Sequence, residues 1–150
     1  MKLIGFLIFL LLAFLAVRGS RWAYLGFALM IPLSFFAFAG FRLDPMSCEL
    51  TFDARHAMLS VTNYGHILVF AFFFLVTTKH FRFSGWPSLG WAVGLTMAMG
   101  AAMELAQGLS GIHHCKAVDL IPDFVGVLAG LMLVILGGAI ADASRRKAGC

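Results

Sequence analysis

The sequence predicts an all-α fold: a polytopic membrane helix bundle with five transmembrane helices. Of its 150 residues, 61% are hydrophobic and only 12% are charged, whereas charged residues make up about 25% of an ordinary soluble domain. The mean hydropathy is +0.95, and apolar runs close to the length of a membrane span, about 20 residues, recur along the chain. These runs are continuously apolar and do not alternate as the strands of a membrane β-barrel do. We therefore expect a single helical transmembrane domain over residues 1–150.

Short polar stretches separate five apolar segments, at residues 3–17, 22–41, 64–78, 89–107 and 120–141. The first segment is short for a span, so a bundle of four transmembrane helices is the alternative. Because Arg18-Gly19-Ser20-Arg21 follows it in place of a small-residue cleavage site, we interpret it as a mature helix and not as a signal peptide. Residues 54–61 predict a short interfacial helix. Segments three to five are expected to form the core of the bundle.

The basic residues predict the orientation of the chain in the membrane. The net charge is +4, but the Lys and Arg residues mostly stand singly between apolar runs, which is typical of topology signals and not of a nucleic-acid-binding surface. If the Arg145-Arg146-Lys147 tail is cytoplasmic, seven basic residues fall on the cytoplasmic side and four on the outer side. We therefore expect a multi-pass protein of a bacterial cytoplasmic (inner) membrane, with the N-terminus outside and the C-terminus inside. Its surroundings would be the lipid bilayer, with no nucleic-acid partner.

Five polar residues within or beside the apolar segments converge, in this topology, at the outer membrane face. They are His66 at the start of the third segment, Glu104 and Gln107 at the end of the fourth, and Asp119 and Asp123 at the start of the fifth. Ionisable residues in membrane spans usually face the bundle interior or a wet cavity, and they often mark a functional site. The sequence therefore predicts a ligand-binding site formed by these five side chains.

A purely structural interpretation of the same residues stays open. Asp119 fits the N-cap of the last segment, and Asp123 suits its first turn, where the helix dipole favours an acid. His66 fits an ordinary interfacial position. Glu104 is the hardest to explain in this way, because a buried carboxylate needs a partner or a proton. We expect His66 or Gln107 to be that partner.

The cysteines and glycines carry further structural predictions. Cys48 and Cys115 both fall on the outer side, which is oxidising in bacteria, so a disulfide between them and a pair of free thiols are both open. His113, His114 and Cys115 offer metal-ligating atoms without the spacing of a known metal motif, and we expect neither a metal ion nor another cofactor. Gly126 and Gly130 form a GxxxG spacing that is typical of close helix packing.

The order of the polar residues resembles the signature of the VanZ-like family of integral membrane proteins. Two stretches carry the resemblance: Glu104-Leu-Ala-Gln107 and Asp119-Leu-Ile-Pro-Asp123-Phe-Val-Gly126-Val-Leu-Ala-Gly130. They are similar to the family pattern E-x-x-Q … D-x-x-x-N-x-x-G-x-x-x-G, with Asp123 at the position of the usual Asn. Asn63-Tyr-Gly-His66 is similar to the histidine that opens an aromatic-rich helix in the family. The resemblance is strongest over residues 60–135. It implies a role in the cell envelope, because the family is named for an accessory protein of teicoplanin resistance.

Three functional hypotheses follow, and whether the protein is an enzyme is left open. In the first, a VanZ-like protein takes part in a cell-envelope or glycopeptide-antibiotic response by binding an amphipathic ligand, such as a lipid-linked envelope precursor, at the outer-face site. In the second, Glu104 and His66, or Asp123, act as general acid and base on a lipid substrate within the membrane. In the third, the chain is a non-catalytic subunit that packs on a partner membrane protein.

Overall fold

The computed structural model is α-helical and describes residues 2–39, 48–49, 51, 53–81, 86–110 and 115–148. Six α-helices, a short 3-10 helix and a pair of two-residue strands make up this part of the chain. In chain order they are α1 (Lys2–Val17), α2 (Arg21–Ala39), β1 (Cys48–Glu49), α3 (Ala54–Ser60), α4 (Tyr64–His80), α5 (Trp86–Ser110), β2 (Cys115–Lys116), the 3-10 helix η1 (Ala117–Asp119) and α6 (Leu120–Ala148).

The helices confirm the all-α prediction, and each begins close to an expected segment. Within the described residues, Pro87–Ser110 in α5 and Ala117–Ala141 in η1 and α6 are long and apolar enough to cross a membrane, and Leu3–Val17 forms a shorter apolar helix. Of the five expected spans, those in α5 and α6 meet the length and hydropathy of a span within the described residues, and both helices extend beyond the predicted apolar runs. The polar residues that ended those runs in the sequence, Gln107 and Asp142, lie inside continuous helices.

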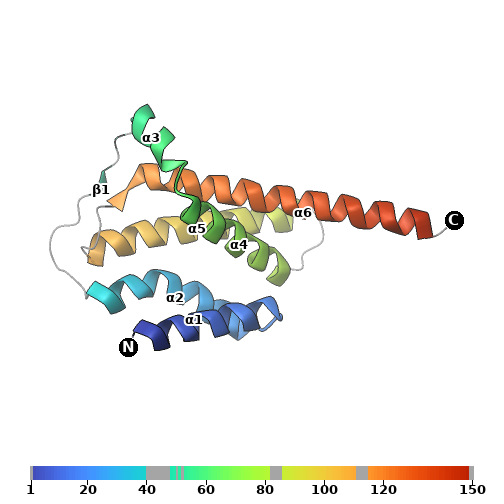
Figure 1. Ribbon diagram of the computed structural model, residues 1–150, viewed down its shortest axis with the longest axis horizontal. Helices are drawn as coiled ribbons and strands as arrows, with labels where there is room; N and C mark the ends of the chain where they lie inside the picture. The colour runs from blue at the N-terminus through green and yellow to red at the C-terminus, as the bar shows by residue number, and fades with distance from the viewer. Residues whose placement is uncertain are drawn as a thin grey trace.

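The five long helices run back and forth along one direction (Figure 1). The helices α2 and α5 end, and α4 and α6 begin, at the left of the view, where α3 and β1 also lie. The C-terminal part of α6 extends to the right beyond the other helices. A Cβ atom added at Gly137 or Gly138 of this part would meet no neighbouring atom within 4 Å. One end of the bundle therefore gathers the segments that carry the predicted site.

The helix α4 is the centre of the packing. Its Phe70, Phe73 and Val76 belong to a buried cluster with side chains of α1, α2 and α5. Its Phe74 faces the other way and packs with Ala92 of α5 and Val127 of α6. Segments three to five all contribute to the core, as expected, and the larger cluster also draws on the first two helices, through Ala13, Ala16, Tyr24, Phe27 and Ile31.

Polar side chains of α4 fix the first helical hairpin to the bundle. The Nζ of Lys79 donates to the carbonyl oxygen of Val17, and a ring nitrogen of His80 lies 2.8 Å from the carbonyl oxygen of Ala16. These carbonyls belong to the last turn of α1, which has no partners for them within the helix. In α2, the hydroxyl of Tyr24 lies 3.0 Å from the hydroxyl of Thr77. The helix α1 is therefore held as an integral part of the bundle.

Two glycines let α6 lie directly against α4. A Cβ atom at Gly126 would stand 2.6 Å from the carbonyl oxygen of Ile67 and 2.9 Å from Cβ of Phe70. A Cβ atom at Gly130 would stand 2.7 Å from the ring of Phe74. Distances this short leave room for hydrogen only. The GxxxG spacing thus lies at a helix–helix contact, which fixes where α6 presents its first turn to α4.

A disulfide and a short strand pair close the left end of the bundle. Cys48 and Cys115 are joined by a disulfide, with their Cα atoms 4.6 Å apart. The same residues are partners in the parallel pairing of β1 with β2, as are Glu49 and Lys116. Of the two arrangements that the sequence left open for these cysteines, the structure has the disulfide. It links the segment before α3 to the segment between α5 and α6.

Candidate functional site

The site begins with an ion-pair-like contact between α4 and α6. His66 lies in the first turn of α4, where Asn63 caps the helix by accepting a hydrogen bond from the backbone N–H of His66. The Nδ1 of His66 lies 2.8 Å from Oδ1 of Asp123, which is in the first turn of α6. Asp123 is 1% exposed and His66 is 22% exposed. The close glycine contact between α4 and α6 therefore brings together a buried carboxylate and a histidine that still reaches the surface.

Glu104 enters the same region from α5 and is only 4% exposed. Its Oε2 accepts a hydrogen bond of 3.1 Å from the backbone N–H of Lys116. Lys116 belongs to β2 and follows the disulfide residue Cys115 directly, so the strand pair and the disulfide hold this donor in place. His66 and Gln107, the partners expected for Glu104, do not bond to it in the structure. His66 bonds to Asp123, and Glu104 accepts its hydrogen bond from the backbone N–H of Lys116.

A glycine makes room for the carboxylate of Asp123 against α5. Gly100 lies one helical turn before Glu104, on the same face of the helix. A Cβ atom there would stand 2.6 Å from Oδ2 of Asp123. The carboxylate of Asp123 therefore lies against the α5 face that carries Glu104. Gly100 is a site residue that the sequence analysis did not single out, although its four-residue spacing from Glu104 was a usable signal.

Within the part of the chain that the structure describes, each of the two buried acids has one oxygen bonded and one oxygen without a partner. Within the described part of the chain, no hydrogen-bond partner lies near Oε1 of Glu104 or Oδ2 of Asp123. A buried carboxylate oxygen without a donor costs on the order of 1–3 kcal/mol or more. The site therefore has an unused capacity to accept hydrogen bonds from something that enters it.

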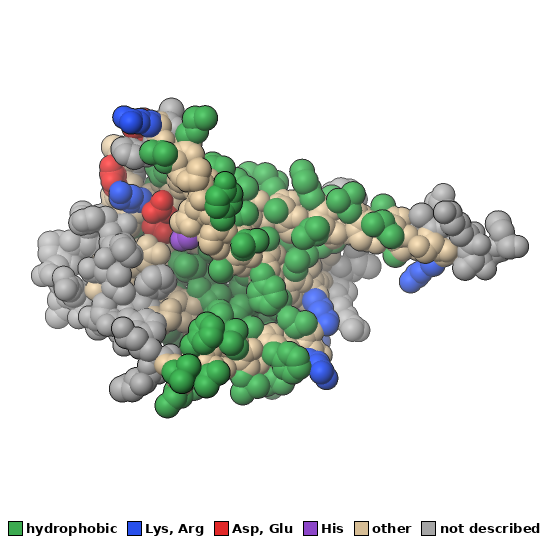
Figure 2. All heavy atoms as spheres, viewed as in Figure 1, with side chains coloured by type: hydrophobic (Ala, Val, Ile, Leu, Met, Phe, Trp, Pro, Cys, Tyr) green, Lys and Arg blue, Asp and Glu red, His purple; other side chains and the backbone are tan. Residues whose placement is uncertain are grey.

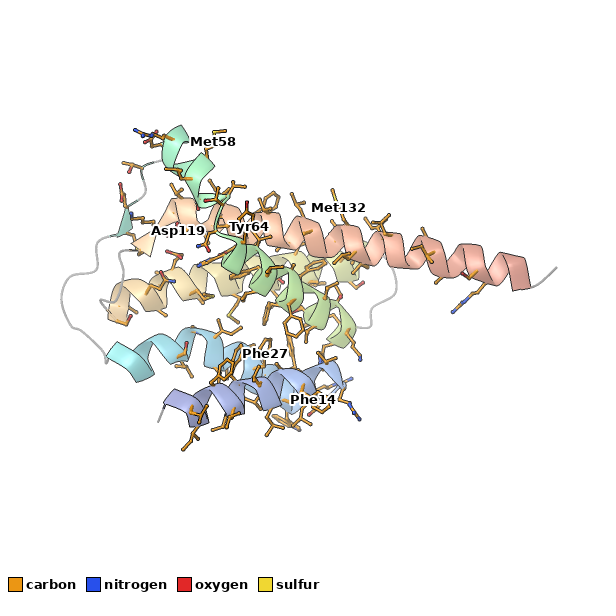
Figure 3. The ribbon with its side chains drawn as sticks, viewed as in Figure 1. Phe14, Phe27, Met58, Tyr64, Asp119 and Met132 are labelled. Carbon is orange, nitrogen blue, oxygen red and sulfur yellow. A yellow bond between two sulfur atoms is a disulfide. The ribbon has the colours of Figure 1, made fainter. Side chains whose placement is uncertain are left out.

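The remaining two predicted residues lie at the edges of this group. Gln107 is 7% exposed and lies on α5, three residues after Glu104. Asp119 is half-buried at the end of η1, and its Oδ1 lies 3.5 Å from the hydroxyl of Ser60, which also donates to the carbonyl oxygen of Val118. A pocket of about 160 Å³ opens beside Asp119; its walls are Glu49, Thr51, Ser60, Lys116, Val118 and Asp119. Figure 3 shows Asp119 at the same end of the bundle as Tyr64, the first residue of α4.

Acidic and basic side chains are distributed unevenly between the two ends of the molecule. On the face in Figure 2, the Asp and Glu side chains that are coloured gather at the left end, next to a histidine and with Lys or Arg side chains among them, whereas the charged side chains coloured towards the right are Lys or Arg. The described acids near the site are Glu49, Asp53, Glu104, Asp119 and Asp123. Among the residues described, no group of three His, Cys, Asp or Glu side chains could hold a metal ion. His113 and His114 lie outside them.

Comparisons with protein-family models, curated proteins and solved structures find no match for this chain.

Proposed function

We propose that the chain is a VanZ-like integral membrane protein that crosses the membrane five times, with its N-terminus outside. Large apolar side chains are exposed on all five long helices, among them Phe6, Leu29, Leu68, Trp91 and Met132. Figure 2 shows that they spread over the middle of the molecule, between its charged ends. Exposed apolar surface of this extent is unusual for a soluble monomer, and a lipid bilayer would cover it. The alternation of the helices supports an odd number of crossings, with α1 as the first.

In this proposal the polar site lies at the outer membrane face and binds the polar group of an amphipathic ligand. The observation that carries it is the pair of buried carboxylates, Glu104 and Asp123, each with an oxygen that has no donor within the described residues. Such groups are costly in an apolar bundle and are retained where they serve a function. His66, which bonds to Asp123, is partly exposed, and the pocket beside Asp119 opens at the same end of the bundle. A lipid-linked envelope precursor has the amphipathic character that this position favours.

Native mass spectrometry of the detergent-purified protein tests this proposal, with the wild type beside Glu104→Gln. Glutamine keeps the shape of the side chain but removes the negative charge and puts an N–H₂ group where an acceptor was. We expect the wild type to retain a lipid-like adduct and Glu104→Gln to lose most of it. The matched control is Asp53→Asn, which removes an exposed charge near the same end and keeps an N-cap for α3.

The control should retain the adduct as the wild type does. A wild-type protein without any adduct, or an adduct that Glu104→Gln leaves unchanged, would contradict ligand binding at this site. It would favour the interpretation that the chain is a structural subunit of a membrane complex.

An enzyme that acts on a lipid substrate is the second candidate, and the contact between His66 and Asp123 favours it. A carboxylate bonded to one ring nitrogen orients a histidine and raises the basicity of its other nitrogen, as in many general bases. The 22% exposure of His66 leaves the ring within reach of a substrate. Incubation with lipid extract separates the two candidates: an enzyme forms a product that His66→Gln abolishes, whereas a binding protein returns the lipid unchanged.

A further inference from the structure

The buried oxygens of the site define which chemistry a ligand must bring. The atoms without a partner in the described residues, Oε1 of Glu104 and Oδ2 of Asp123, are both acceptors. An ionised carboxylate has no hydrogen to donate. With both acids ionised, the hydrogen bonds that a ligand forms with these two oxygens come from its donors.

The charge around these atoms excludes an anionic group as the part that enters. Asp119 and Glu49 line the pocket at the same end of the bundle. The basic side chains of this end that the structure describes, Lys116 and Arg55, are exposed. Lys116 donates its backbone N–H to Glu104, whereas its side chain is exposed. Among the described residues, His66 pairs with Asp123 and no Lys or Arg side chain is bonded to either acid, so a phosphate or carboxylate that entered would meet acidic groups in a low-dielectric region, which is unfavourable.

The position of the two acceptors favours a compact cation with several N–H groups. Both lie at the same face of α5, one at Glu104 and the other against Gly100 a turn away. A primary ammonium carries three donors on one nitrogen and a full positive charge, so it suits carboxylate oxygens that have no donor among the described residues. A quaternary ammonium has the same charge and no donor. A metal ion would need more protein ligands than the described residues bring together.

We infer that the site recognises a protonated primary amine, such as the one in an ethanolamine lipid headgroup. This inference depends on the proposed ligand-binding function and specifies the group that is bound. The same chemistry is available from a lipid headgroup or from a free amine in solution. The site lies at one end of an apolar bundle. When the amine belongs to a lipid headgroup, the acyl chains of that lipid would therefore lie along the exposed apolar helices.

The experiment compares phospholipids whose headgroups differ in charge and in N–H donors. The protein is reconstituted in nanodiscs with equal amounts of phosphatidylethanolamine, phosphatidylcholine and phosphatidylglycerol, released, and the retained lipids are quantified by native mass spectrometry. We expect phosphatidylethanolamine to be retained over phosphatidylcholine by about tenfold, the discrimination that one charge-assisted hydrogen bond provides. In Glu104→Gln and Asp123→Asn the ratio should fall towards one, and Asp53→Asn should keep it.

The source of the amine is tested by adding free ethanolamine to protein in phosphatidylcholine alone and measuring thermal unfolding. A rise in Tm in the wild type that Glu104→Gln lacks would show that the free amine binds, and the amine would remain the recognised group. Equal retention of phosphatidylethanolamine and phosphatidylcholine, or preference for phosphatidylglycerol, would overturn the inference while leaving a ligand site in place. Wild-type protein that retains no lipid and shows no response to ethanolamine would overturn both. If either acid variant fails to fold, the ranking of the three lipids in the wild type still tests the inference.

Discussion

At the scale of single residues, the site depends on how a bundle of apolar helices accommodates two buried acids. Each acid has one oxygen satisfied by the protein: Asp123 by His66, and Glu104 by the backbone N–H of Lys116. Neither partner could be assigned from spacing along the chain, because both contacts join segments brought together only by helix packing. The residue that allows the arrangement is Gly100, which leaves space for the carboxylate of Asp123.

Replacing Gly100 with alanine should therefore disturb the site directly. The new Cβ would stand 2.6 Å from Oδ2 of Asp123, so the carboxylate must turn and its bond to His66 must weaken. We expect the free energy of unfolding in detergent to fall by about 1–3 kcal/mol, the usual cost of overpacking a filled position. Denaturant unfolding measures this loss, and native mass spectrometry should show less retained lipid.

Gly94 of the same helix is the matched control for this change. Nothing lies within 4 Å of its Cβ position, so Gly94→Ala should leave the site intact and, through helix propensity, stabilise α5 by up to about 1 kcal/mol. If Gly100→Ala proves as stable as Gly94→Ala and retains as much lipid, the packing of Asp123 against α5 is wrong.

The polar residues themselves were predictable from the sequence, for a simple physical reason. Ionisable groups are rare in apolar segments, so His66, Glu104 and Asp123 stood out, and alternation of the helices placed them at one end. What the sequence could not give was the pairing among them. Hydrogen bonds between helices depend on rotation about each helix axis, which apolar segments without a polar face leave undetermined.

At the scale of elements, α4 organises the bundle because it packs on both sides. Its phenylalanines divide between a cluster with α1 and α2 and a cluster with α5 and α6. The sequence predicted the helices, because long apolar runs leave few alternatives. It did not predict that the first hairpin shares the core, since the capping of α1 by Lys79 and His80 joins residues more than 60 positions apart.

The contact of α6 with α4 should be the most sensitive helix–helix contact to a single methyl group. A Cβ at Gly126 would stand 2.6 Å from the backbone oxygen of Ile67, and backbone atoms cannot turn aside as a side chain can. We expect Gly126→Ala to lower the free energy of unfolding by about 1–3 kcal/mol or more. Because a shift of α6 also moves Asp123 away from His66, retained lipid should decrease as well.

Gly137→Ala tests the same substitution in the same helix where no neighbour lies within 4 Å. It should unfold at the same or slightly higher denaturant concentration than the wild type. Equal stability of Gly126→Ala and Gly137→Ala would mean that α6 does not lie against α4 as closely as the structure has it.

At the scale of the whole molecule, the two ends of the bundle differ in their charged side chains and in the disulfide that one of them carries. The end that carries the site also carries the disulfide between Cys48 and Cys115, which suits an oxidising compartment. At the opposite end, Arg18, Arg21, Lys79 and Arg145 are exposed, which is typical of a cytoplasmic face. Both properties support the proposed orientation, in which the site faces outward.

Cysteine labelling in intact cells tests this orientation. In a Cys150→Ser background, Thr62→Cys introduces a thiol at an exposed position just before α4, and Ser144→Cys introduces one at an exposed position near the end of α6. We expect a membrane-impermeant maleimide to label Thr62→Cys in intact cells, and Ser144→Cys only after the cells are permeabilised. The background without an added cysteine should stay unlabelled until a reductant opens the disulfide, because disulfide sulfurs do not react with maleimide. The reverse pattern would place the site in the cytoplasm, where glutathione and thioredoxin keep thiols reduced; Cys48 and Cys115 would then be free thiols, and the anchor that holds Lys116 near Glu104 would be lost.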